Sequence, residues 1–156
     1  MKPRSCAEWM SALLQHFNLP LQVDAEQDVC TLHFNGKPSV HLIGSMPEGF
    51  VNVMCEAGVL PNLQAADSLL GLLALNRCDS AEYSVGVTVH RQSGTVIACS
   101  RQRWKALEPS ATARLLECVH DKVDAVQRVL GKPDNRPQAT MDAKMSRMLL
   151  ARHAAR

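Results

Sequence analysis

The sequence predicts an α+β fold, a compact α-β-β-β-α-β-β-α sandwich on a twisted, mostly antiparallel sheet. Three observations support this prediction: helical apolar spacing at both ends of residues 1–131, two blocks of period-two alternation between them, and a leucine-dense segment separating the blocks. A chain of 156 residues with 46% apolar and 21% charged side chains can bury one continuous core. We therefore expect one folded domain over 1–131, followed by a basic tail at 132–156, flexible or conditionally helical.

The first helix has recognisable start and stop signals. Ser5 can cap its N-terminus, and Glu8, three residues later, completes a capping box. Asn18 and Pro20 are expected to end it. The residues at helical spacing between these signals predict one apolar stripe: Trp9, Ala12, Leu13, His16 and Phe17.

The first strand block begins with a hairpin. Residues 29–34 alternate, and Asn35-Gly36 is a strong two-residue turn signal, so the next strand, 39–43, is expected to run antiparallel to the first. A third strand is expected over 50–55. The alternation assigns one face of the first strand to Cys30, Leu32 and Phe34, and the other to Val29, Thr31 and His33.

The central helix, expected over 63–76, is apolar almost all round. Such a helix has more apolar surface than one sheet face can cover. One interpretation is a helix buried deep in a larger core, and the other is the seam of a homodimer, with Leu69, Leu72 and Leu73 in the contact.

The second strand block and the last helix complete the predicted domain. Strands are expected over 83–89 and 95–100, joined by a turn at 93–94, and Pro109 suits the first turn of the last helix. Gly131 is expected to end that helix. Its predicted apolar stripe consists of Leu115, Leu116, Val119, Val123, Val126 and Leu130.

The charges divide the chain into two parts. Residues 1–130 carry 11 Lys/Arg and 13 Asp/Glu, a net −2, whereas residues 131–156 carry 6 and 2, a net +4. A mildly acidic body argues against a dedicated nucleic-acid surface there. The start lacks the apolar core of a signal peptide, and no run of about 18 apolar residues is present. We therefore expect a cytoplasmic protein without membrane insertion.

The cysteines are expected to be reduced, buried and without function. They occur about one per predicted element, and none forms a C-x-x-C motif. The six are Cys6, Cys30, Cys55, Cys78, Cys99 and Cys118.

Candidate catalytic pairs fail on geometry. Cys30 and His33 are an odd number of residues apart on a strand, and Cys118 and His120 are two apart on a helix, so neither pair shares a face. Nucleotide-binding glycine motifs are missing from the sequence. We predict no catalytic, cofactor-binding or metal-binding residues and no enzyme activity. A site assembled in space is left open for three residues: His41, His90 and Cys99.

The order of elements and three stretches of sequence resemble the Tir-chaperone (CesT-like) family, the class I type III secretion chaperones of Gram-negative bacteria. The stretches are LPLQVDAEQDVCTLHFNG, LPNLQAADSLLGLLALNR and YSVGVTVHRQSGTVIACSRQ. The resemblance implies a bacterial cytoplasmic chaperone without catalysis or cofactor. Its partners would be a second copy of itself, the N-terminal segment of a secreted effector held in extended form and kept secretion-competent, and the secretion apparatus.

The resemblance also implies two surfaces. The first helix and first hairpin would supply an effector-binding groove formed by Trp9, Leu13, Phe17, Leu32, Phe34, Val40 and Leu42. The dimer interface would contain Leu69, Leu72, Leu73 and Val87.

Two further functions are weighed against the secretion chaperone. One is a dimeric adaptor or regulatory protein of the same fold that binds a folded partner, or a nucleic acid through the basic tail. The other is a small enzyme or ligand-binding domain with an unrecognised pocket. A salt-sensitive nucleic-acid complex would favour the adaptor, because phosphate contacts weaken as salt rises.

Overall fold

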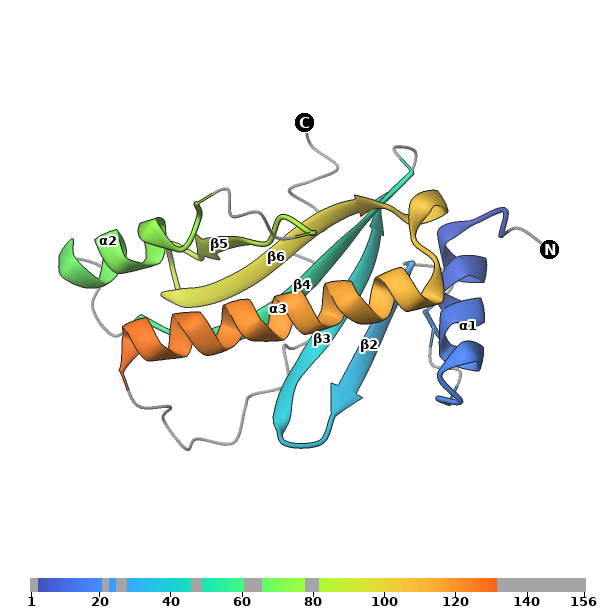
Figure 1. Ribbon diagram of the computed structural model, residues 1–156, viewed down its shortest axis with the longest axis horizontal. Coiled ribbons are helices and arrows are strands. Elements are labelled where there is room, and N and C mark those ends of the chain that lie inside the picture. The colour runs from blue at the N-terminus through green and yellow to red at the C-terminus, as the bar shows by residue number, and fades with distance from the viewer. Residues whose placement is uncertain are drawn as a thin grey trace.

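A six-stranded sheet and three α-helices make up the part of the chain that this computed structural model describes, residues 3–20, 23–24, 28–45, 49–60, 66–77 and 82–131 (Figure 1). The strands are β1 (Val23–Asp24), β2 (Val29–Phe34), β3 (Lys37–Ser45), β4 (Phe50–Val59), β5 (Gly86–Val89) and β6 (Thr95–Arg103). The helices are α1 (Cys6–His16), α2 (Ala66–Ala74), α3 (Pro109–Leu130) and the short 3-10 helix η1 (Trp104–Ala106). The predicted α+β class and order of elements are confirmed, and β1 is an addition that the alternation did not predict.

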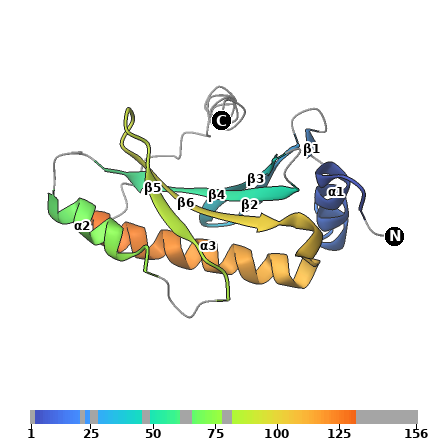
Figure 2. The same cartoon turned by 90° about the horizontal axis from the view of Figure 1, so that it is seen from above.

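The sheet has the strand order β1-β2-β3-β4-β6-β5, and every neighbouring pair is antiparallel. The long helix α3 runs across one face of this twisted sheet (Figure 2). The other two helices lie at opposite ends, α1 beside β1 and η1, and α2 beside α3 and close to β5 (Figures 1 and 2). The two short helices α1 and α2 therefore have different neighbours.

The N-terminus of α1 is capped nearly as predicted. Ser5 Oγ accepts a hydrogen bond from the Glu8 N–H at 3.1 Å, while the Glu8 carboxylate accepts from the Arg4 N–H at 2.6 Å, one residue before the expected donor. Asn18 ends the helix in a left-handed conformation (φ 52°) that Asn tolerates. The buried residues of α1 are Cys6, Trp9, Met10, Leu13 and Leu14, whereas Ala12 and His16 are exposed, so the predicted stripe was wrong at those two positions.

The first hairpin is the predicted one: β2 has the expected bounds, and β3 is longer than the expected 39–43. Asn35 and Gly36 connect β2 to β3, with Gly36 at φ 69°, and the register pairs Phe34 with Lys37. Cys30 and Leu32 are buried on one face of β2, while His33 on the other face is exposed. The alternation therefore identified the inward face correctly.

The core lies between α3 and the sheet. Five of the six predicted stripe residues of α3 are buried, and Leu130 is half-buried against the core. They pack with the inward residues of β3, β4 and β6, among them Leu42, Val53 and Val96. Burying each such side chain contributes roughly 1.5–3 kcal/mol, so this layer dominates the stability of the domain.

Several boundaries differ from the prediction. The strands β3, β4 and β6 extend beyond the expected 39–43, 50–55 and 95–100. The strand expected over 83–89 begins only at Gly86, because Tyr83, Ser84 and Val85 make no ladder with β6. The central helix is described over Ala66–Ala74, and the expected residues 63–65 lie outside the described ranges. The predicted basic tail, 132–156, also lies outside them.

Candidate functional site

The predicted effector groove consists mostly of core residues. Five of its seven side chains are at most 5% exposed, which leaves two half-buried ones, Phe17 and Phe34. Because these five lie on the face that α1 and α3 cover, they do not line an open groove in this structure. The five are Trp9, Leu13, Leu32, Val40 and Leu42. A role in effector binding stays a prediction for the groove, and burial narrows its accessible part to Phe17 and Phe34.

Hydrogen bonds and ring contacts hold these residues in place. Trp9 Nε1 donates to the Leu107 carbonyl at 2.9 Å, which ties α1 to the segment before α3. Phe34 meets the His120 ring edge to face at a centroid distance of 4.7 Å, and His120 Nε2 lies 3.1 Å from the Pro38 carbonyl. These contacts connect the hairpin tip to α3.

The residues that the structure describes cover the outer edge of β2 over only part of its length. Among the described residues, β1 pairs with Val29 and Cys30 alone, so the following positions of β2 have no described neighbour on that side. Unpaired backbone groups on an edge strand can accept an added strand. At this end of the sheet α1, whose C-cap residue is Phe17, contacts β1 and β3 (Figure 1).

The face of the sheet opposite α3 mixes apolar and polar side chains. Thr31 Oγ1 lies 3.0 Å from His41 Nδ1, and burial lowers the pKa of His41, with a smaller contribution from the charge of His33. At the β4–β6 end, the guanidinium carbons of Arg101 and Arg103 lie 4.6 and 5.6 Å from the centre of the Phe50 ring. The alternation placed Val29, Thr31 and His33 on this side of β2, and no sequence motif gave this side a function.

The residues of the predicted dimer interface that lie on α2 do not share one exposed side of the helix. Leu72 is 3% exposed and packs in the core, whereas Leu70 and Leu73 are 63% and 64% exposed. Leu69 and Val87 are half-buried. Leu72 is therefore a core residue in this structure, and its part in an interface stays a prediction. Leu70, which was not among the predicted interface residues, lies one turn before Leu73 on the outward side.

Close contact with α3 explains why one side of α2 is buried. A Cβ added to Gly71 would lie 2.8 Å from Val129 Cγ1, so only glycine allows this approach of the two helices. Lys122 Nζ on α3 donates to the Leu75 carbonyl at the end of α2 at 2.7 Å. A cation at a helix C-terminus satisfies a free carbonyl there, and this contact fixes the direction of α2.

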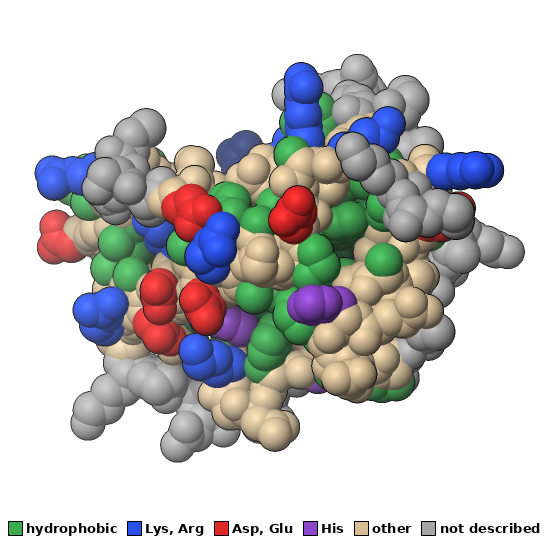
Figure 3. Space-filling view, turned by 45° about the vertical axis from the view of Figure 1, so that its right-hand side comes forward, with side chains coloured by type: hydrophobic (Ala, Val, Ile, Leu, Met, Phe, Trp, Pro, Cys, Tyr) green, Lys and Arg blue, Asp and Glu red, His purple; other side chains and the backbone are tan. Residues whose placement is uncertain are grey.

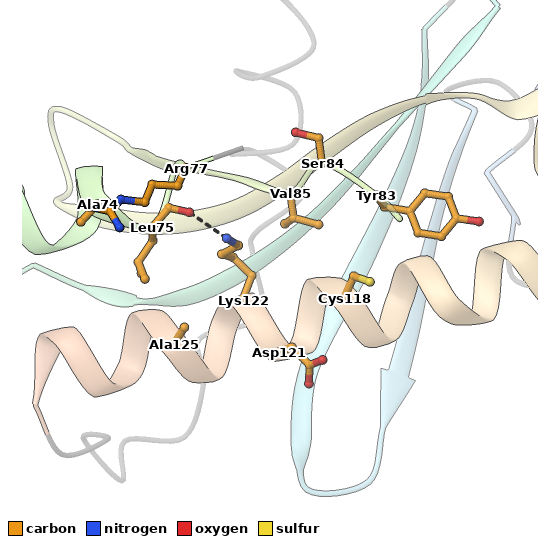
Figure 4. A pocket seen from close by; sticks show the side chains of 10 residues that line it. All are labelled: Ala74, Leu75, Arg77, Tyr83, Ser84, Val85, Cys118, Asp121, Lys122 and Ala125. Atoms are coloured by element: carbon orange, nitrogen blue, oxygen red, sulfur yellow. Dashed lines mark hydrogen bonds between the residues drawn. The ribbon is translucent and has the colours of Figure 1, made fainter. Parts of the chain in front are cut away.

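A hollow of about 440 Å³ lies between the end of α2, the segment before β5 and α3 (Figure 4). Side chains of both charge signs line it, including Arg77, Asp121 and Lys122. Cys118 also lines it, and burial together with the nearby charge of Asp121 raises the pKa of its thiol. A raised pKa keeps the thiol protonated, which is unfavourable for a nucleophile.

The other described cysteines are also poor nucleophiles. Burial raises the pKa of Cys6 and of Cys55 to about 12, and that of Cys30 to about 11. Cys99 shifts in the same direction for the same reason. Among the described residues, no three His, Cys, Asp or Glu side chains gather where they could hold a metal ion.

Hydrophobic side chains reach the surface in small groups separated by acidic and basic ones on the side that carries α3 and α1 (Figure 3). One exposed ion pair there joins Arg114 to Glu82, with Nε 3.0 Å from Oε2. A surface of mixed sign differs from the basic stripe of a nucleic-acid-binding domain. None of the helices in the described ranges has the length and apolar character needed to cross a membrane.

Comparison with solved structures shows what this fold is similar to. A chain of the heterodimeric ExoU–SpcU complex from the type III secretion system of Pseudomonas aeruginosa matches at 18% identity with a TM-score of 0.63, covering 77% of this chain and 96% of that chain. A chain of the Yersinia pestis type III secretion chaperone SycH with a stable fragment of YscM2 matches at 14% identity and 0.63, covering 78% and 99%. The ExoT–SpcS complex of Pseudomonas aeruginosa matches at 18% and 0.57, covering 80% and 97%.

The sequence comparisons identify the family. A search of curated proteins found no match. The model of the Tir chaperone protein (CesT) family matches residues 10–127, a span that runs from the middle of α1 almost to the end of α3. This match covers well over half of the chain, so the chain belongs to the Tir chaperone protein (CesT) family.

Proposed function

We propose that this protein is a non-catalytic chaperone of the bacterial cytoplasm that binds the N-terminal segment of a type III secreted effector in extended form. Binding would keep the effector stable and competent for secretion. The observation that carries the proposal is the family match over 10–127. The similar structures named above support it, since one is described as a type III secretion chaperone bound to a fragment of another protein.

For the client, we propose the β2 edge beside α1. The backbone groups of β2 beyond Cys30 would pair with an extended client segment, and Phe17 would contact apolar client side chains. Leu32 and the buried residues of β3 would shape this region from beneath, as core residues, without touching the client. The proposed client site thus consists of the outer edge of β2 and Phe17, in place of the seven side chains of the predicted groove.

For self-association, we propose the outward side of α2. Leu70 and Leu73 are two of the four large hydrophobic residues that are exposed in the described part of the chain, and they are one helical turn apart. Burying both in a dimer would contribute roughly 1.5–3 kcal/mol per side chain. A standard interface buries about 800 Å² per partner, which is more than two leucine side chains provide. The interface would therefore extend to the half-buried Leu69 and Val87 at its margin.

The experiment is co-expression with the N-terminal segments of candidate effectors, followed by purification and limited proteolysis. We expect a complex in which roughly 50 to 100 effector residues, disordered when free, become protected, as coupled folding and binding requires. The matched control is the same effector without its N-terminal segment, which should not co-purify. Binding only to a folded effector domain would contradict the proposal, and a salt-sensitive complex with nucleic acid would favour the adaptor function instead.

A further inference from the structure

One end of the sheet is closed by a side chain. In the part of the chain that the structure describes, β5 is the last strand in the order and pairs with β6 alone, so its other edge faces away from the sheet. At the centre of that edge, Asn76 Oδ1 accepts from the Val87 N–H at 2.6 Å, and Asn76 Nδ2 donates to the Val87 carbonyl at 3.0 Å. Both backbone groups of Val87 are thereby satisfied.

These two bonds reproduce what a further strand would do. In an antiparallel ladder, a hydrogen-bonded residue pair exchanges both its N–H and its C=O with one opposite residue. The carboxamide of Asn76 offers one acceptor and one donor in the same arrangement. Backbone groups alternate between the two edges of a strand, so Val87 and Val89 are the residues of β5 that face its outer edge, and Asn76 occupies the first of these two positions.

Asn76 is held at this position by the end of α2. Its backbone N–H donates to the Leu73 carbonyl at 3.0 Å, and the preceding Leu75 is fastened to α3 through the Lys122 contact. The side chain itself is exposed, so it does not serve to fill the core. Among the described residues, the two hydrogen bonds to Val87 are what favours an asparagine here.

We propose that Asn76 closes the β5 edge to strand addition. The surface formed by Leu70, Leu73 and β5 then accepts a second copy of this chain by side-chain packing and not through a continuous intermolecular sheet. An extended client is excluded from this edge. The choice of a second copy as occupant rests on the proposed dimer, whereas the closure of the edge by Asn76 does not.

The test is hydrogen exchange at the Val87 amide, measured by NMR, in the wild type and in Asn76→Ala. Loss of the bond is expected to speed exchange about tenfold, the usual effect of one hydrogen bond of ordinary strength. Asn76→Asp keeps an acceptor for the Val87 N–H and places an oxygen against the Val87 carbonyl. In this variant the exchange rate of the Val87 amide should therefore stay closer to the wild-type rate. Thr88→Ala is the matched control, because Thr88 is an exposed residue of the same strand whose side chain makes no hydrogen bond in the described structure.

Sedimentation of the same samples reports the second consequence. With the edge open, Asn76→Ala is expected to form species larger than the wild-type assembly, while Thr88→Ala is not. Repeating both measurements in a Leu73→Asp background separates the two proposals. A wild type that sediments as a monomer would refute the dimer, whereas unchanged Val87 exchange in Asn76→Ala in both backgrounds would overturn the role of Asn76.

Discussion

The two small helices at opposite ends of the sheet are both rich in apolar residues, yet they are used differently. α1 buries five residues between the sheet, η1 and the start of α3. Among the described side chains of α2, only Leu72 is buried, and two leucines point outward. Because α2 lies beside the end of α3 and beyond the sheet face, only one of its sides has a partner (Figure 2). The apolar content of a helix therefore does not reveal whether its partner lies within the same chain.

The largest expected difference between the two helices is in how much a leucine of each contributes to stability. Leu13→Ala in α1 should lower the free energy of unfolding by about 2–5 kcal/mol, because Leu13 is fully buried and leaves a cavity. Leu70→Ala in α2 should change it by no more than about 0.5 kcal/mol in the monomer, since the side chain is mostly in solvent. Urea denaturation of both variants in a Leu73→Asp background measures the two effects. Equal losses would show that the two ends are packed alike.

Self-association is the next test of the α2 end. The double variant Leu70→Asp, Leu73→Asp should weaken dimerisation at least about 100-fold, because two unpaired carboxylates would have to be buried in the seam. Sedimentation equilibrium measures the dissociation constant. Leu19→Asp is the control: Leu19 is an exposed leucine just after α1, and the change should leave the dimer intact. A wild type that is monomeric at micromolar concentration would refute the seam.

Client binding tests the α1 end. Phe17→Ser should weaken binding of the effector segment about tenfold, the effect of losing one partly buried aromatic contact, while the dimer and the helix content stay unchanged. Leu13 is unsuitable for this experiment because it is a core residue. Val59→Ser, a change at a 54% exposed valine at the end of β4, is the control. Isothermal titration calorimetry gives the affinities, and normal binding by the Phe17 variant would place the client elsewhere.

The smallest expected effect concerns thiol chemistry at the two ends. At pH 8 Cys6, with a pKa of about 12, carries roughly one thiolate per ten thousand molecules and is buried. Cys118, half-buried in the hollow beside α2, should be alkylated at least about tenfold faster. Raising the pH toward 12 increases the thiolate fraction of Cys6, so its reaction should accelerate with pH while the protein stays folded. Mass spectrometry of peptides after timed alkylation measures both rates, and equal rates would indicate that α1 opens readily.

Much of the fold was determined by local patterns in the sequence. The Asn35-Gly36 turn, the alternation in β2 and the stripe of α3 each define an element and its inward face, because side-chain periodicity depends only on the local backbone. The same patterns predicted the fold class. The family resemblance rested on the order of these elements, and the match over 10–127 confirmed it.

The tertiary structure decided what covers each apolar face. Trp9, Leu13 and Val40 have the pattern expected of groove residues and of core residues alike, and the packing of α1 and α3 made them core. Leu72 and Leu73 are adjacent in sequence, yet the approach of α2 to α3 at Gly71 buries one and exposes the other. The pairing of Asn76 with Val87 joins residues 11 positions apart, a contact that no side-chain period predicts. Periodicity shows that a side chain belongs to a face, whereas its neighbour across that face depends on contacts between distant segments.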